Sequence, residues 1–244
     1  YFLWKRTRSL QHSLKKGWIF LHLRKPETPA MYSERLLTLI PEKYHRRIVT
    51  HEHFYLKEEF DLMGIHLNTR NPNEPHDYSG HVSCTCHSVE EVKSKKHFYD
   101  YVFMSPVYDC ITKTGTFSGY TPEELRTAGK ERIIDTKVMA LGGITPDNIL
   151  EIKDFGFGGA VVLGDLWNKF NVCTDRDYLG VIRHFKKLRK WRIKKFNLPL
   201  ELPIFFIFDP SRQSKIECRA FSFFRFYTNA TTIVFNNRFR NRKT

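Results

Sequence analysis

The chain has 244 residues, of which 41% are hydrophobic and 27% are charged, a composition typical of a globular protein with a sizeable core. No apolar run reaches the roughly 18 residues that a membrane-spanning helix needs, and the first residues show no secretory signal pattern. The five cysteines have no framework spacing, which favours a reducing cytoplasm.

The net charge of +14 is concentrated at the two ends of the chain. Residues 1–20 hold five basic and no acidic residues, and residues 191–244 hold eleven basic and three acidic residues. The body, 21–190, carries 24 basic and 23 acidic residues, a net charge of only +1. Basic, aromatic-rich ends are typical of nucleic-acid-binding segments, but charge alone is weak evidence for that partner.

A shifted reading frame offers another interpretation of both ends. Back-translation of WKRTRSLQHSLKKGWI, residues 4–19, with permissible codons read from the third base gives EEDQIITTLFEEGLDI, a capped helical pattern leading into a strand. The same treatment of KWRIK, residues 190–194, gives Met-Ala-Asp and a stop codon. We therefore predict that residues 1–20 are out of frame and that 191–244 form a basic, non-native or disordered tail. An intact reading frame at the locus would contradict this.

Between residues 21 and 190, short apolar runs alternate with segments of helical period, such as PAMYSERLLTLI at 29–40 and TPEELRTA at 121–128. Strands interleaved with helices indicate a parallel sheet with covered faces. The predicted fold is an α/β, (βα)8 TIM barrel over residues 21–190 whose first strand unit is corrupted or missing, with an open doubly wound sheet as the competing topology. Seven strands are visible: HLR (22–24), IVT (48–50), GIHL (64–67), HVSC (81–84), YVFMS (101–105), VMAL (138–141) and AVVLG (160–164).

The last two of these strands end in glycine. Gly142 and Gly143 follow VMAL, and Gly164 closes AVVLG. Uncovered N–H groups at strand ends, followed by a helix start, favour a phosphate site. The alternative is that these glycines only permit tight strand-to-helix turns.

Two cationic side chains lie where they would meet an anion. Arg24 directly follows apolar strand residues, so its charge must face a wet cavity or a partner. Lys113, beside Thr112, lies in the hydroxyl-rich loop DCITKTGTFSG at 109–119, which could close over a polyanionic substrate. Without other support, a lysine in a polar loop is more often simply solvated.

Several histidines near strand ends raise the possibility of a metal site. Cys84, Cys86 and His87 form a Cys-x-Cys-His run, but the second half of a four-ligand zinc pattern is missing. Alternation places the two cysteines on one face of the strand and Thr85 on the other. Structural use of these residues is therefore favoured over metal binding or a Cys-His nucleophile. The histidines concerned are His51, His53, His66, His81 and His87.

The ordered motifs of residues 21–185 resemble the thiamine phosphate synthase / thiazole tautomerase (TenI) family. They are LHLRKPE, MGIHLN, CTCHSVEEV, DYVFMSPVYDCITK, ALGGI and GAVVLGDLW. The resemblance implies a TIM barrel that joins a pyrimidine diphosphate to thiazole phosphate, with Mg2+ and release of pyrophosphate. It implies that Arg24 and Lys113 hold the diphosphate and that Thr112 holds the thiazole phosphate. It also implies backbone N–H donors at Gly142, Gly143, Leu163 and Gly164, and Thr85 in place of a catalytic serine.

The chain also departs from the family pattern. His51 and Asn71 replace the two metal-binding carboxylates, which should weaken Mg2+ binding because hard cations prefer anionic oxygen. Pro106 stands where the tautomerase branch has its catalytic histidine. We therefore expect a cytoplasmic enzyme of thiamine biosynthesis acting on a small phosphorylated substrate. The alternatives are a tautomerase, a regulatory relative that binds thiazole or thiamine phosphate, and a nucleic-acid-binding protein that uses the basic ends. The sequence allows a homo-oligomer without defining one.

Overall fold

The structure, a computed structural model, describes residues 19–109, 118–167, 180, 183–184 and 204–208. The chain divides into two units, Tyr1–Asp209 and Pro210–Thr244, and every described residue belongs to the first. No helix in the described ranges is both long and apolar enough to cross a lipid bilayer.

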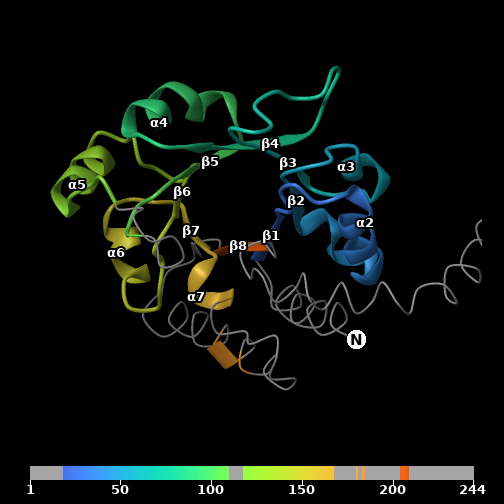
Figure 1. Cartoon of the computed structure of the whole chain (residues 1–244). Coiled ribbons are helices and arrows are strands. Elements are labelled where there is room, and N and C mark those ends of the chain that lie inside the picture. The colour runs from blue at the N-terminus through green and yellow to red at the C-terminus, as the bar shows by residue number, and fades with distance from the viewer. Residues whose placement is uncertain (1–18, 110–117, 168–179, 181–182, 185–203, 209–244) are drawn as a thin grey trace, which may run out of the picture. The chain divides into compact units, whose positions relative to one another are not determined.

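The first unit is organised around a curled parallel sheet (Figure 1). Each strand pairs in parallel with the strand that follows it in the chain. The order is sequential, without the reversal that defines a doubly wound sheet. Its strands are β1 (Ile19–Leu23), β2 (Ile48–Thr50), β3 (Gly64–Leu67), β4 (His81–Cys86), β5 (Tyr101–Met104), β6 (Val138–Leu141) and β7 (Gly159–Val162).

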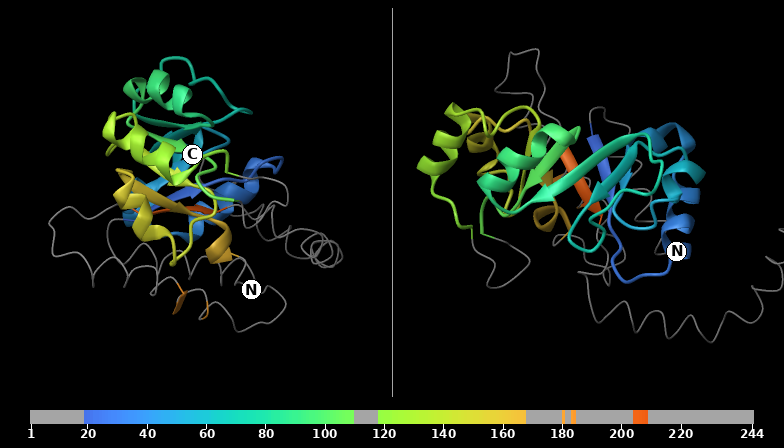
Figure 2. Two further views of the ribbon diagram at one scale, coloured as in Figure 1. Left: turned by 90° about the vertical axis from the view of Figure 1, so that its left-hand side faces the viewer. Right: turned by 90° about the horizontal axis from the view of Figure 1, so that it is seen from above.

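An eighth strand, β8 (Ile204–Phe208), completes the pairing. It is parallel to β7 on one side and to β1 on the other, so the strand order closes on itself. The right-hand view of Figure 2 shows β8 in orange beside β1 in blue. The range predicted as a tail, 191–244, therefore contains a paired strand.

The short strands of the sheet lie in the core of the protein. Every residue of β2, β3, β5 and β7 is buried, as expected for parallel strands covered on both faces. Two apolar clusters result. The larger lies between the sheet and its helices. The smaller consists of Tyr101, Phe103, Met139 and Val161, residues of β5, β6 and β7 that alternate with those of the larger cluster.

Helices cover the outer face of the sheet (Figure 1). Two have side-chain caps at their first turn: Ser88 accepts a hydrogen bond from Glu91 N, and Thr121 forms a reciprocal capping box with Glu124. Such caps satisfy helix N–H groups that have no intrahelical acceptor. The helices are α2 (Ala30–Leu39), η1 (Glu42–Arg47), α3 (Leu56–Glu59), α4 (Val89–Lys95), η2 (Lys96–Phe98), α5 (Pro122–Lys130), α6 (Ile149–Asp154) and α7 (Gly164–Trp167).

The prediction of an α/β fold with a parallel sheet is confirmed, and the seven predicted strands overlap β1 to β7 in order. The structure differs from the prediction in the eighth strand. We expected this strand before residue 21, whereas in the structure it is formed by residues 204–208. The out-of-frame origin of residues 1–20 stays a prediction, since residues 1–18 lie outside the described ranges.

Two truncated chains test the role of β8. A chain ending at Asp209 keeps the strand, whereas a chain ending at residue 203 loses it, together with five paired positions on β1 and three on β7. Each backbone hydrogen bond contributes about 0.5–1.5 kcal/mol, so we expect the shorter chain to lose roughly 4 kcal/mol of stability relative to the longer one. Urea unfolding followed by circular dichroism measures the difference. Equal midpoints for the two chains would show that β8 does not hold the sheet together.

Candidate functional site

Side chains from neighbouring strands converge inside the sheet near its carboxyl end. All eight strands run in the same direction around the sheet, so the residues that end them or directly follow them share one end. Arg24 follows β1, His51 follows β2, and Thr85 lies near the end of β4. The His51 N–H donates to Leu23 O at 3.0 Å, which ties the end of β2 to β1.

Three histidines form the centre of this site. One ring nitrogen from each of His22, His51 and His66 lies within 4.8 Å of the others. His22 Nδ1 and His51 Nε2 are 2.9 Å apart, and the rings of His51 and His66 stack with centroids 4.2 Å apart. All three side chains are buried, with exposed fractions of 0%, 3% and 0%. We call these residues the histidine cluster.

Hydroxyl groups on β4 and β5 hold the histidine cluster in place. Tyr101 Oη lies 2.8 Å from His22 Nε2. Ser83 Oγ and Thr85 Oγ1 each lie 2.8 Å from a nitrogen of His66. Buried polar groups that find such partners avoid the cost of desolvation. Thr85, a candidate from the sequence, thus belongs to this site.

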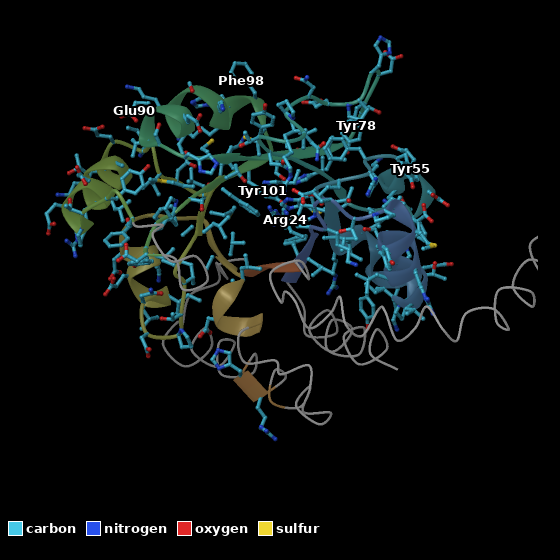
Figure 3. The ribbon with its side chains drawn as sticks, viewed as in Figure 1. Arg24, Tyr55, Tyr78, Glu90, Phe98 and Tyr101 are labelled. Carbon is cyan, nitrogen blue, oxygen red and sulfur yellow. The ribbon has the colours of Figure 1, made fainter. Side chains whose placement is uncertain are left out.

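Burial keeps the histidine cluster uncharged. It lowers the pKa of His22 and of His51 well below the usual range, and lowers that of His66 to about 3. The second cause for His66 is the positive charge of Arg24, which also contributes at His51. The guanidinium therefore lies close enough for its field to act on two of the rings, and Figure 3 shows Arg24 and Tyr101 in the same central region of the molecule. At neutral pH the site combines three neutral imidazoles with the nearby cations Arg24 and Arg70.

The glycine-ended strands lie side by side. Leu141 on β6 is in register with Val161 on β7, so Gly142 and Gly143 emerge next to Leu163 and Gly164. Within the described part of the chain, the N–H groups of Gly142 and Gly143 donate no hydrogen bond. Their carbonyl groups do accept bonds: Tyr108 N donates to Gly142 O, and the Asn148 side chain donates to Gly143 O.

The same glycines are also required by the backbone. Gly142 and Gly143 have φ values of +101° and +64°, which side chains disfavour. A Cβ atom at Gly143 would lie 2.5 Å from Asp109 O, and one at Gly142 would lie 2.9 Å from Pro106 Cα. The tight-turn reading therefore explains why glycine stands here. The two N–H groups remain available as donors in either reading.

The loop that carries Lys113 and Thr112 lies outside the described residues, which stop at Asp109 and resume at Ser118. The two flanks of this loop are joined, because Ser118 N donates to Asp109 Oδ1 at 2.7 Å and Ser118 Oγ donates to Val107 O at 2.7 Å. Asp109 is also the residue that packs against Gly143. The loop thus leaves and rejoins the fold beside the glycine-ended strands.

Among the described residues, the other candidates His53, His87, Cys84 and Cys86 lie outside the histidine cluster. His53 Nε2 lies 3.0 Å from Thr28 O, and the exposed His87 lies 3.0 Å from Ser105 O. Cys84 and Cys86 are buried free thiols in the cluster between sheet and helices, on the opposite face from Thr85, as the strand alternation predicts. In the described ranges no Cys-x-Cys-His metal grouping forms, and His22, His51 and His66 are the group with metal-ligand spacing.

The sequence of the chain was compared with known proteins. A profile described as thiamine monophosphate synthase matches residues 5–166. The chain belongs to the thiamine monophosphate synthase family. This confirms the family suggested by the sequence motifs, and the match extends into the segment 1–20 that we predicted to be out of frame.

Individual relatives agree with this. A thiamine-phosphate synthase from Methanobrevibacter smithii is 26% identical over 171 residues, which cover 66% of this chain and 80% of the relative. Among solved structures, thiamine phosphate pyrophosphorylase from Bacteroides thetaiotaomicron is 70% identical and superposes with a TM-score of 0.73, covering 79% of this chain and 93% of that chain. The pyrophosphorylase from Pyrococcus furiosus, 18% identical with a TM-score of 0.54, shares the fold.

The Mg2+ that family resemblance implies does not fit the residues present at the replaced positions. His51 offers an imidazole nitrogen inside the histidine cluster, and Asn71 Nδ2 donates to His51 O at 2.9 Å. The neighbouring carboxylate, Glu52, accepts from Lys25 N at 2.8 Å and pairs with Arg70 at 3.6 Å. Mg2+ prefers an octahedral set of oxygen ligands. At these two positions His51 offers only an imidazole nitrogen and Asn71 only a neutral amide oxygen, so neither supplies the carboxylate charge.

Sequence reasoning missed three members of the site, His22, Ser83 and Tyr101. His22 lies two residues before Arg24 on β1, so strand alternation places both side chains on the same face. The spacing of His22 and Arg24 could therefore have identified His22 from the sequence. Tyr101 begins β5, far from the strand end, and only the register of the sheet brings its hydroxyl group to His22.

A pair of glycine variants tests whether the β6 turn tolerates a side chain. We expect Gly143→Ala to lower the free energy of unfolding by about 1–3 kcal/mol, because it combines an unfavourable φ with a clash against Asp109 O. The matched control is Gly119→Ala, where a Cβ atom would meet nothing within 4 Å, and its effect should stay within about 0.5 kcal/mol. Denaturant titration provides both values. If Gly143→Ala left the free energy of unfolding unchanged, the turn would not be constrained as described.

Proposed function

We propose that this chain is a thiamine phosphate synthase. It joins a pyrimidine diphosphate to thiazole phosphate, releasing pyrophosphate and forming thiamine phosphate. The observation that carries the proposal is the juxtaposition of the glycine-ended strands β6 and β7. The N–H groups of Gly142 and Gly143 donate no hydrogen bond to any of the described residues. Membership of the family supports the same substrates.

The glycine-ended strands hold the thiazole phosphate in this proposal. The backbone N–H groups of Gly142, Gly143, Leu163 and Gly164 would donate to its oxygen atoms. A phosphate can approach the three glycines closely because they carry no side chain. Thr112 adds a hydroxyl donor from the loop whose two flanks meet beside Gly143. Backbone donors fixed by the sheet need no reorganisation when the substrate binds.

Arg24 and Lys113 bind the diphosphate. The bond between the exocyclic methylene carbon of the pyrimidine and the diphosphate oxygen breaks, and the electron pair leaves with pyrophosphate. The thiazole ring nitrogen then forms the new bond to that carbon, which produces the thiazolium of thiamine phosphate. Negative charge grows on the leaving oxygen, so fixed cations there lower the barrier. Thr85, held by His66, donates to the departing group.

A second candidate function follows from the replaced carboxylates. His51 and Asn71 occupy the positions at which the resemblance implies Mg2+ ligands, and we propose that this pair does not hold Mg2+. A chain that keeps the phosphate site without the metal site would bind thiazole or thiamine phosphate without condensing the two halves. Such a protein would act as a regulatory relative. Thiazole tautomerase activity has less support, because Pro106 replaces the histidine of that branch.

The closure of the sheet into a barrel is part of the same proposal. We infer that the closed sheet is a (βα)8 barrel in which β8 fills the position of the strand expected before residue 21.

The free thiols of Cys84 and Cys86 support a cytoplasmic location. Nucleic-acid binding through the basic ends would depend on residues outside the described ranges, and such binding should weaken steeply as salt is raised.

The direct test is an assay of the full chain for thiamine phosphate formation, with and without Mg2+. We expect turnover that falls about 100-fold or more in Lys113→Ala, the size typical for removal of one group that stabilises transition-state charge. Lys130→Ala, which removes an exposed cation from α5, is the matched control and should leave the rate unchanged.

The binding measurement separates the two candidates. Calorimetric binding of thiamine phosphate without any turnover would replace the synthase with the regulatory relative. An absence of binding for both thiazole phosphate and thiamine phosphate would overturn both.

A further inference from the structure

We propose that His22, His51 and His66 bind one divalent transition-metal ion, of the class of Zn2+ or Co2+, inside the sheet. The inference stands on the geometry of these three side chains and does not rest on the proposed function. The nitrogen donors are those that such borderline ions prefer, in contrast to the oxygen donors preferred by Mg2+.

To form the site, the ring nitrogens of His22 and His51 must separate slightly and the ring of His66 must turn out of its stacked contact with His51. Around a tetrahedral Zn2+ ion with Zn–N bonds of 2.0–2.1 Å, two ligand nitrogens lie roughly 3.3–3.4 Å apart. His22 Nδ1 and His51 Nε2 are 2.9 Å apart, and one nitrogen of His66 completes a set within 4.8 Å. An ion between the rings would separate the first pair slightly and draw His66 inward. Three protein ligands leave a fourth position open, as in catalytic zinc sites.

The hydroxyl groups around the histidine cluster match the outer shell of a metal site. A metal-bound histidine usually donates its second ring N–H to an oxygen acceptor, which fixes the ring and its tautomer. Tyr101 Oη lies at His22 Nε2, opposite the nitrogen that faces His51. His66 has Ser83 at one nitrogen and Thr85 at the other, so one hydroxyl partner remains whichever nitrogen binds the ion.

The protonation state also favours metal binding. Imidazole must be neutral to act as a ligand, and burial keeps the pKa of each of the three histidines below its usual range. The proton shared between His22 and His51 only has to move to another ring nitrogen. No net proton release from these rings accompanies binding at pH 7.

Positive charges near the histidine cluster weaken its affinity for a cation. Arg24 and Arg70 act on His51, and Arg24 acts on His66. The same positive charges oppose a divalent cation. An anionic fourth ligand, such as hydroxide or a phosphate oxygen, would offset that repulsion. The site therefore favours an ion that carries an anion with it over a bare cation.

Titration of the full chain with Co2+ tests the proposal, because tetrahedral Co2+ gives strong visible absorption. We expect one ion per chain, retained in excess Mg2+. Substitution of each ligand, His22→Gln, His51→Gln or His66→Gln, should weaken binding more than about 10-fold, the loss that even outer-shell changes produce. His76→Gln is the matched control, since the His76 side chain is 92% exposed and lies outside the cluster, and it should bind as the unchanged chain does.

The proposal is overturned by an absence of stoichiometric binding, or by binding that survives all three substitutions. Binding lost only in the Cys84→Ser, Cys86→Ser double variant would assign the ion to the thiols and would also overturn it. Circular dichroism shows whether each variant folds. Should the histidine variants unfold, X-ray absorption of Zn2+ bound to the unsubstituted chain decides. Scattering from three imidazole rings supports the site, and a shell of oxygen or sulfur alone contradicts it.

Discussion

The uniform direction of the strands is the constraint on which the rest of the structure depends. Because every strand pairs in parallel with its neighbours and the order closes through β8, all carboxyl ends meet at one end of the sheet. Arg24, His51 and Thr85 are separated by tens of residues in the chain and are brought together there. The same pairing sets β6 beside β7 and thereby the two glycine ends beside each other.

The site has two halves of different chemistry. One half consists of backbone N–H groups at Gly142 and Gly143, fixed by the positive φ values that only glycine adopts readily. The other half is the histidine cluster, whose polar atoms are satisfied by Tyr101, Ser83 and Thr85. Arg24 is the cation whose field reaches the second half. An anion is favoured by the glycines and by Arg24, whereas a nitrogen-preferring metal ion is favoured by the imidazoles.

Much of the fold could be predicted from the sequence, because buried parallel strands appear in it as short continuous apolar runs. The apolar runs at 48–50 and 138–141 correspond to β2 and β6 in full. The strand IFFIF at 204–208 could not be found in this way, since the phenylalanines around it follow neither helical nor strand period. Only pairing with β1 and β7 identifies it. In the site, Arg24 and Thr85 were found as polar residues near strand ends. His22 lies two residues before Arg24, and its role depends on side-chain contacts with His51 and with Tyr101 on β5.

The most direct test of the central claim is a crystal structure of the full chain with thiamine phosphate. The account predicts the phosphate group between the ends of β6 and β7, with oxygen atoms about 2.7–3.2 Å from the backbone nitrogens of Gly143 and Gly164. Phosphate density at another place in the fold, or side chains filling the space between these two strand ends, would contradict it.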